Sequence, residues 1–551
     1  MERRLLLAIV LMIVVAVVPQ LLLRKPPRPA PGADTTLVAD SATARRDSAA
    51  PVAPAPVRSA DAPPAAPPVA AASYDTVVLE RAHTRMRFTT LGGALDQALY
   101  PDYKSFRAAG RPVNLVRPGD RLLAHRVVVG NDTVRLDSVA FTARVRPGGV
   151  TMTGSRGAVT LEAEYTVPAG RDYVVEVSGR IAGLEGRGGL LLVSLGTGFA
   201  QHEADSTDNY RYYGVTTRRN DIKETNFRDV PGGETRTLDG PFDWVAVKSK
   251  YFLAALLSPD SSRSLLSGAI MQAAPRPNRG PATVVQTWVT LPVGPDARFR
   301  YDLYVGPQEA RTLHRMGRAL DRAAQYGWIF RPIVMPVASW IARLLRWMHE
   351  NMHLAYGWVL VLFGILVRVV LWPLNQRAMK SQVAMMAVQP LLKDVQERHK
   401  ENPEKQQQEL LKIYKEHKVN PLGGCLPLLL PWPVLIALFF AFSKAIELRG
   451  APFLWLPDLA QKDPFYIIPV LMGASMWALS KLSSAGMPPN PQTKMMTVVM
   501  PIMMTVLFLN FPSGLNLYYA VSNIVSLPQQ YFINKSRKAE LAKRQVASPG
   551  R

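Results

Sequence analysis

The sequence has a single cysteine, Cys425, and it lacks several motifs that would mark an enzyme or a nucleic-acid-binding protein. One cysteine cannot form an intrachain disulfide, and its position in an apolar run favours a small buried side chain. No Walker-type phosphate-binding loop is present, which argues against a nucleotide-driven process. The formal net charge is +23, but the arginines of the polar region are scattered, without a basic cluster interleaved with aromatic residues. This pattern argues against specific recognition of nucleic acid.

Long apolar runs occur at the start of the chain and in its last third, which divides the sequence into a polar part and a membrane part. The first run, Leu5–Leu23, follows two arginines and is about long enough to span a bilayer as a helix. A cleaved signal peptide is the alternative, but the run ends in Leu-Leu-Leu-Arg-Lys rather than in a small-residue cleavage site. We therefore predict an uncleaved transmembrane anchor over residues 1–25. The Pro- and Ala-rich residues 26–73 predict an extended tether.

Residues 74–310 alternate apolar and polar side chains between turns that contain Gly or Pro, as in GVTMTGSRGAVTLEAEYTVP. A period of two predicts half-buried antiparallel strands, and many such strands without intervening helices predict an all-β sandwich. No His, Asp, Glu, Ser or Cys in this region has a spacing typical of a catalytic or metal site. We interpret the region as a binding or scaffolding domain.

Residues 311–353 change to a helical period and predict a linker followed by an amphipathic helix that lies along the membrane surface. Aromatic residues and arginines just before a membrane span are typical of such a helix. Its apolar side is expected to carry Trp340, Met348 and either Leu344 or Leu345.

The end of this helix reads HENMH, from His349 to His353, and matches the H-E-x-x-H pattern of zinc metalloproteases. In those enzymes, two histidines one helical turn apart bind the metal. A catalytic zinc also needs a third protein ligand, and no downstream motif supplies one. We therefore favour a function without a metal or other cofactor, and a zinc assay would test the metalloprotease alternative.

Residues 354–533 contain five more apolar runs, which we predict to be membrane-spanning helices near 354–374, 422–442, 464–482, 495–511 and 514–533. A basic segment, 376–419, follows the first of these spans and has the pattern of a helical hairpin, in which Asn402 caps the second helix. The tail, 534–551, is also basic. Because Lys and Arg favour the cytoplasmic side, both segments and the N-terminus are expected there. The β domain is then expected in the periplasm of a bacterial inner-membrane protein.

Polar side chains recur every three or four residues in the last predicted span. They therefore share one helix face: Asn516, Tyr519, Asn523, Ser526 and Gln530. Hydrocarbon cannot satisfy their hydrogen-bonding groups, so this face is expected to contact other helices or water.

The span near 354–374 carries one charged residue, Arg368, in the stretch GILVRVVLWPL. An arginine in the middle of a span costs roughly 2.5 to 3.5 kcal/mol on insertion scales. Its side chain either snorkels to the membrane surface or lies in a water-containing cavity, which the polar face of the last span would share.

A cavity of this kind is compatible with two functions. A transporter would need polar groups across the whole membrane, often with repeated halves, but no repeat is detectable and the predicted spans contain no Asp or Glu. A device that inserts membrane proteins needs only a half-open groove. The client's own apolar helix enters the lipid, and only its polar flank needs a wet path.

Four stretches of the membrane part carry a resemblance: NPLGGCLPLLLPWPVLIALFF (Asn420–Phe440), ELRGAPFLWLPDL, DPFYIIPVLMGASM and FPSGLNLYYAVSNIV (Phe511–Val525). In their order and spacing they strongly resemble the YidC-type membrane protein insertases. The resemblance is specific over about residues 326–533. In the β domain, WVAVKSKYFLAAL and LYVGPQE also look similar to that family.

The resemblance implies a multi-domain membrane protein with an N-terminal transmembrane anchor, a periplasmic all-β supersandwich and a five-helix transmembrane insertase core with a cytoplasmic helical hairpin. It implies a non-enzymatic function: the insertion, folding or assembly of integral membrane proteins through a hydrophilic groove open to the cytoplasm and to lipid. The implied partners are nascent membrane proteins, the ribosome, the Sec translocon, the targeting machinery and the lipid bilayer.

The resemblance also implies roles for individual residues. Arg368 corresponds to the family's groove arginine, and Tyr519 to a tyrosine that contacts clients. Two departures exist: Gly364 stands where relatives can carry a polar residue, and the sequence PWP at 431–433 adds a proline that predicts a kink. A hydrophobic slide, along which clients leave the groove, is implied around Leu430, Pro433 and Met504.

Overall fold

The structure is a computed structural model of the chain. It describes residues 74–108, 110–184, 188–259, 266–276, 282–323, 331–400, 402–417, 431–485 and 494–546. The predicted anchor (1–25) and tether (26–73) lie outside the described residues, as does Leu430.

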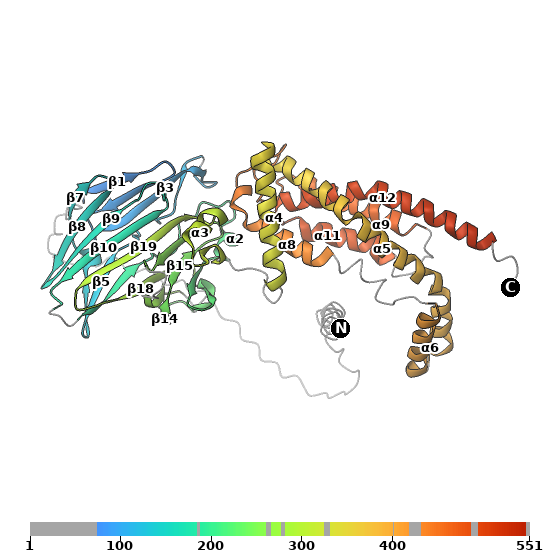
Figure 1. Ribbon diagram of the computed structural model, residues 1–551, viewed down its shortest axis with the longest axis horizontal. Helices are drawn as coiled ribbons and strands as arrows, with labels where there is room; N and C mark the ends of the chain where they lie inside the picture. Colours follow the sequence, from blue (N-terminus) through green and yellow to red (C-terminus); the bar gives the residue numbers. More distant parts are fainter. Residues whose placement is uncertain are drawn as a thin grey trace, which may run out of the picture. The chain divides into compact units, whose positions relative to one another are not determined.

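The described residues of the β domain form three antiparallel sheets. Figure 1 shows their strands. A small sheet has the order β1 (Thr76–Glu80), β2 (Arg85–Thr89), β3 (Ala94–Lys104) and β4 (Pro112–Asn114). A nine-stranded sheet has the order β13 (Ile222–Asn226), β12 (Gly214–Arg218), β15 (Trp244–Lys248), β16 (Phe252–Leu257), β19 (Arg298–Pro307), β10 (Val174–Ala182), β9 (Val159–Thr166), β8 (Gly149–Arg156) and β7 (Thr142–Arg146). A six-stranded sheet has the order β14 (Thr235–Phe242), β17 (Leu266–Ala273), β18 (Val285–Val293), β11 (Gly189–Ser194), β5 (His125–Val129) and β6 (Asp132–Arg135).

The two larger sheets share one apolar core, as the sequence period predicts. Every second residue of β9 is buried, while the residues between them are exposed or half-buried. His125 of the six-stranded sheet and Tyr301 of the nine-stranded sheet are both fully buried, and the His125 Nε2 lies 2.7 Å from the Tyr301 hydroxyl. The prediction of an all-β sandwich is therefore confirmed.

Part of the nine-stranded sheet is covered on its second face as well. Trp244 of β15 and Leu253 of β16 pack there with Leu313 of α3 (Ala310–Met316) and Leu320 of the short helix η4 (Leu320–Arg322). All residues of β15 and β16 are buried for this reason, so these two strands read as continuous apolar runs rather than as an alternation.

The helical region follows the β domain. Its elements are α4 (Arg331–Met352), α5 (Tyr356–Arg398), α6 (Pro403–Glu416), α8 (Pro431–Lys444), η6 (Ile446–Leu448), α9 (Ile467–Ser483), η7 (Met495–Val499), α11 (Met500–Phe508) and α12 (Ser513–Val546). Helix α12 packs against both α9 and α5 (Figure 1). Short elements within the β domain are η1 (Leu136–Ser138), α2 (Ser206–Tyr210) and η2 (Phe227–Asp229).

Helices α5, α8, α9, α11 and α12 lie within or overlap the predicted spans, but their ends differ from the predicted ones. Among the described residues, 356–373 is the segment long and apolar enough to cross a membrane, while the apolar segments Ile467–Ser483 and Thr497–Phe508 are shorter. Helix α5 continues from that segment into the hairpin without a break, and α12 continues into the predicted tail as far as Val546.

Helix α4 packs against α8. The buried face of α4 includes Ile341 rather than its neighbour Trp340. The buried positions are Val334, Ala338, Ile341, Leu345 and Met348. Trp340 is 56% exposed, so it lies outside this buried face, unlike Met348 and Leu345. One residue corresponds to about 100° of rotation, which turns Trp340 away from the face that Ile341 occupies.

The hairpin is formed by the end of α5 and by α6. The Asn402 side chain accepts a hydrogen bond from the Lys405 backbone N–H at 3.1 Å, and Pro403 occupies the first position of α6. Val388 and Leu392 of α5 pack against apolar residues of α6. The predicted cap is confirmed, because Asn402 satisfies a donor that has no partner inside the helix.

Candidate functional site

Helix α12 carries the predicted polar face, and most of it is buried. Asn516, Asn523, Ser526 and Gln530 are each at most 7% exposed, and Tyr519 is half-buried. Polar side chains inside a helical membrane region face neighbouring helices or water, because lipid offers them no hydrogen bonds. The face therefore belongs to the interior of the helical region.

Two neighbouring helices receive hydrogen bonds from this face. The Asn516 amide donates to the Phe508 carbonyl at the end of α11 at 3.0 Å. The Asn523 amide donates to the Ser475 hydroxyl of α9 at 3.3 Å. These bonds hold the first half of α12 against α9 and α11.

Arg368 of α5 reaches the same helix from another side. Its Nε donates to the Ser522 carbonyl at 3.1 Å, and the Ser526 hydroxyl donates to that same carbonyl at 2.6 Å. Arg368 is neither fully buried nor fully exposed. The structure therefore brings the predicted groove arginine to the backbone of the polar helix, between Tyr519 and Asn523.

Several buried polar atoms of α12 have no hydrogen-bond partner among the described residues: Asn516 Oδ1, Gln529 Nε2, Gln530 Nε2 and Asn534 Oδ1. A buried polar atom without a partner costs about 1–3 kcal/mol in a dry interior. Along this helix, these atoms therefore need hydrogen-bond partners that the described protein groups do not supply.

Tyr518 and Tyr519 differ in their surroundings. The Tyr518 ring is 5% exposed and packs near Phe363 and Phe442, at ring centroid distances of 5.6 and 6.2 Å. Tyr519 is half-buried and lies 5.6 Å from Phe508. Of the two tyrosines, Tyr519 retains the more accessible ring.

Gly364 allows α5 and α12 to approach each other closely. It is buried, and a Cβ placed there would lie 3.2 Å from a methyl group of Val521 and 3.5 Å from the Tyr518 carbonyl. A side chain at this position would require Val521 to shift. The close packing of α5 against α12 therefore explains why a glycine occupies position 364 in this chain.

Sequence reasoning missed part of the polar face. Ser522, Gln529 and Asn534 of α12 are also buried, and Asn534 donates to the Leu482 carbonyl of α9. These residues lie next to the predicted positions on the helix, so the polar face is wider than a single row. The signal was present in the sequence as the polar pairs at 522–523 and 529–530.

The residues implied for a hydrophobic slide are only partly described. Met504 of α11 is half-buried against the core, and Pro433 lies in the first turn of α8. The exposed apolar side chains of α11 are instead its neighbours: Ile502, Met503, Val506 and Leu507. Leu430 precedes α8, outside the described residues.

The HENMH stretch does not form one helical turn with two aligned histidines. Helix α4 ends at Met352, and His353 has a positive φ of 53°. The Nδ1 of His349 lies 2.6 Å from the Leu354 carbonyl, and its ring stacks on Tyr356. Within the described ranges, no group of three potential His, Cys, Asp or Glu ligands comes together. The geometry of a zinc protease is therefore not formed at these histidines.

Comparisons with known proteins cover both parts of the chain. A family described as 60Kd inner membrane protein matches residues 347–540, and one described as YidC periplasmic domain matches residues 76–348. The membrane protein insertase YidC of Geobacter metallireducens is 30% identical over 559 residues, which cover 98% of this chain and 100% of that relative.

Two further matches are partial or distant. The membrane protein insertase YidC of Magnetococcus marinus is 36% identical over 316 residues, which cover 57% of this chain and 55% of that relative. A crystal structure of an active YidC insertase with its first transmembrane domain resolved is 18% identical. It covers 84% of this chain and 93% of that one, with a TM-score of 0.35.

Proposed function

The chain belongs to the YidC family of membrane protein insertases, and from this premise we propose that Arg368 and the polar face of α12 line the groove through which it inserts its clients. The observation that carries this proposal is the hydrogen bond from the Arg368 Nε to the Ser522 carbonyl. It holds a cationic side chain of one helix against the polar face of another.

Polar atoms of this face that lack a hydrogen-bond partner support the groove. The partnerless polar atoms of Gln529 and Gln530 lie beyond Ser526 on α12, farther from its N-terminus. Each would cost about 1–3 kcal/mol in a dry interior, and a hydrated groove removes that cost. The atoms of Gln529, Gln530 and Asn534 outnumber the single partnerless oxygen of Asn516 at the other end of this face. We therefore place the hydrated end of the groove toward the C-terminal half of α12, which the predicted topology directs to the cytoplasm.

The mechanism follows from charge and burial. The polar and often acidic flank of a client enters the groove beside Arg368, where a cation and polar groups replace part of its hydration. This shortens the dry path and lowers the cost of carrying polar groups across the membrane. Burial of the client's apolar helix in lipid then supplies the driving force, at about 25 cal/mol per Å² of apolar surface. No chemical reaction is involved, so the insertase is not an enzyme.

The exit toward lipid is proposed to run along α11 and α8. Helix α11 has four exposed apolar side chains, Ile502, Met503, Val506 and Leu507. Met504 of the same helix packs against the core. An apolar client helix can contact such a surface without losing hydrogen bonds. Leu430, Pro433 and Met504 are proposed to form the hydrophobic slide with these residues.

The proposed topology places both termini and the hairpin (376–419) in the cytoplasm and the β domain (74–310) in the periplasm. The linker and interfacial helix (311–353) join that domain to a five-span core (354–533), and the tail (534–551) is basic. The basic hairpin and tail suit the anionic ribosome, while the Sec translocon is a proposed partner for larger clients.

Photocrosslinking from α12 tests the proposal. A photoreactive residue at Tyr519 is expected to form an adduct with a ribosome-bound client that contains a single span. The matched control is Ile524, which is 44% exposed on the same helix but about 140° away around its axis. Stronger adducts from Ile524 than from Tyr519 would reject the polar face as the client path.

A further inference from the structure

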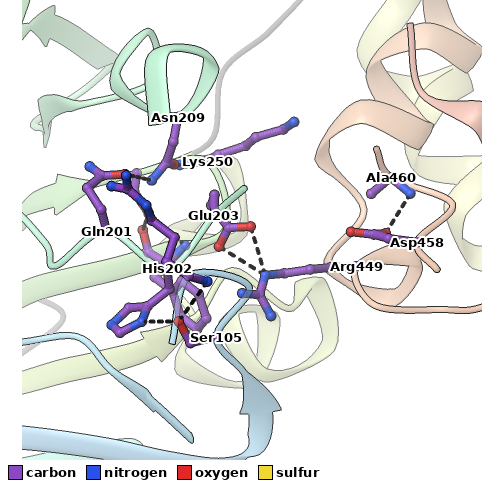
Figure 2. Close-up of polar contacts among 12 residues, drawn as sticks. Ser105, Gln201, His202, Glu203, Asn209, Lys250, Arg449, Asp458 and Ala460 are labelled. Carbon is purple, nitrogen blue, oxygen red and sulfur yellow. Dashed lines mark hydrogen bonds and ion pairs between the residues drawn. The ribbon is translucent and has the colours of Figure 1, made fainter. Parts of the chain in front are cut away.

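An ion pair joins the β domain to the loop between α8 and α9, residues 449–466. The Arg449 Nε lies 3.0 and 3.1 Å from the two carboxylate oxygens of Glu203 (Figure 2). Both side chains are almost fully buried, at 2% and 5% exposure. The β domain and the helical region belong to one compact unit, Ala72–Arg551.

The surroundings of Arg449 are aromatic. Its guanidinium carbon lies 4.7 Å from the centre of the Phe106 ring and 5.8 Å from that of Phe252, both in the β domain. Burial raises the pKa of the Glu203 carboxyl, and the charge of Arg449 partly offsets this effect. Removing one partner of such a buried pair leaves the other charge without compensation, which is strongly destabilising.

The segment that presents Glu203 is itself held in place. His202 has one ring nitrogen 3.0 Å from the Ser105 hydroxyl and the other 2.6 Å from the Asn114 carbonyl. The Gln201 amide donates to the Tyr213 hydroxyl at 2.7 Å. Figure 2 shows Arg449 extending toward this segment from the loop. Glu203 is therefore a rigid anchor and not a mobile surface carboxylate.

The other side of the loop binds the first turn of α12. The backbone N–H groups of Ser513 and Gly514 donate to the carbonyls of Gln461 and Leu459, at 2.7 and 2.9 Å. The Ser513 hydroxyl donates to the Asp458 carbonyl at 3.2 Å. The first N–H groups of a helix have no acceptor inside it, so the loop supplies them.

The same loop holds the first residues of α9 and α5. The Asp463 carboxylate accepts hydrogen bonds from the Ile468 N–H at 2.7 Å and from the Trp455 indole at 3.2 Å. The Phe453 ring packs onto Gly357 so closely that a Cβ at Gly357 would overlap it. Three helices that begin at one end of the core are thus tied to a single loop.

We propose that the Glu203–Arg449 ion pair is a positioning element through which the β domain holds the 449–466 loop over the first turns of α5, α9 and α12. It thereby keeps that end of the insertion groove closed. The assignment of this end to the periplasm rests on the proposed function and topology. The pair does not touch the client. It acts through the loop, which covers Ser513 at the start of the polar helix.

A cysteine at Ser513 reports directly on this closure. Ser513 is fully buried beneath the loop, and the Ser513→Cys exchange is nearly isosteric. In a Cys425→Ser background, a membrane-impermeant maleimide added to spheroplasts reaches only the periplasmic face. We expect slow labelling in this parent. Labelling is expected to be at least about tenfold faster in Glu203→Gln and Arg449→Gln, because each substitution removes one partner of the buried ion pair and loosens the loop. The double variant is expected to label no faster than either single variant, because the two residues act as one unit.

Matched variants keep the test decisive. Arg87→Gln removes an ion pair with Asp96 inside the β domain and is expected to label like the parent. Arg449→Lys retains the charge and is expected to lie between the parent and Arg449→Gln. Gly357→Ala displaces Phe453 with the ion pair intact and is expected to expose Ser513. Equal labelling of the parent, Glu203→Gln and Arg449→Gln would overturn the proposal, even if Gly357→Ala labels rapidly.

Insertion is measured separately in the same membranes. A single-span client with an acidic flank is followed in the parent protein, and failure to insert it would reject the proposed function. The labelling rates do not depend on that result. Loss of protease resistance of the β domain in Glu203→Gln, together with fast labelling of Arg87→Gln, would also overturn the proposal, because general unfolding would then explain the exposure.

Discussion

Arg368 and Ser526 donate hydrogen bonds to the same acceptor, the backbone carbonyl of Ser522. The two donors come from different helices, α5 and α12, and the shared acceptor lies between Tyr519 and Asn523. A guanidinium group that uses its Nε for this bond still has further N–H donors. Arg368 is therefore anchored to the polar helix, and its remaining N–H groups are available for the client contact proposed above.

Replacing Arg368 separates the role of its charge from that of its hydrogen bond. Arg368→Ala is expected to lower the insertion of clients with acidic flanks about tenfold, equivalent to about 1.4 kcal/mol. Arg368→Lys keeps the charge, so it is expected to retain most of the activity. Insertion is measured by protease protection of the translocated flank, and a client with a neutral flank serves as the control. Equal insertion by all three proteins would exclude an electrostatic role.

Replacing either of two glycines in the helical region by alanine is expected to lower the stability of the protein by different amounts. A Cβ at Gly473 of α9 would overlap the Thr505 hydroxyl of α11, whereas a Cβ at Gly364 would lie 3.2 Å from a Val521 methyl group. Gly473→Ala is expected to cost about 1–3 kcal/mol, typical of an overpacked site, and Gly364→Ala less. Thermal unfolding of the full-length protein in detergent measures the difference.

A compensating change provides the control for the glycine pair. Gly473→Ala combined with Thr505→Ala removes the atom that the new methyl group would meet, so the stability is expected to return most of the way. If Gly473→Ala unfolds at the same temperature as the parent protein, the close approach of α9 and α11 is wrong.

His125 predicts an acid-sensitive β domain. Burial lowers the pKa of His125 to about 3, while an unfolded chain has an ordinary value of about 6.5. Below pH 6.5 the unfolded state takes up a proton that the folded state rejects, so the free energy of unfolding falls by about 1.4 kcal/mol per pH unit until pH 3. Between pH 7.5 and pH 5 the expected loss is about 2 kcal/mol.

The histidine prediction is checked by unfolding midpoints of the full-length protein at several pH values. His125→Gln is expected to flatten the dependence below pH 6.5, whatever its effect at pH 7.5. His417→Gln is the control, because His417 is exposed and lies directly after α6, outside the β domain. An unchanged slope in His125→Gln would show that other groups cause the acid sensitivity.

The cap of α6 predicts a local change in the hairpin. Asn402→Ala removes the acceptor of the Lys405 N–H and is expected to destabilise α6 by about 1 kcal/mol. Hydrogen exchange in the first turn of α6 should then accelerate about fivefold. Asn402→Ser retains a capping oxygen and is expected to exchange nearly as slowly as the parent. Identical exchange in Asn402→Ala would mean that the cap contributes nothing.

Local patterns in the sequence were sufficient for several features. The period of two predicted the β sandwich, and apolar runs predicted helices where α5, α9, α11 and α12 lie. The spacing of Asn516, Asn523, Ser526 and Gln530 predicted a shared face, and Asn402 predicted the cap of α6. Each of these features depends on residues that are close in the sequence. The fixed geometry of a helix or strand then determines which of those residues share a face.

Partners across long distances in the chain were decided by packing. Arg368 meets the Ser522 carbonyl 154 residues away, and Arg449 meets Glu203 across 246 residues. Trp340 shows the same limit, because a helical period tolerates a rotation of one residue that only contact with α8 settles. A helical or strand pattern states which face a side chain occupies. Which neighbour that face meets depends on how all the elements fill space together.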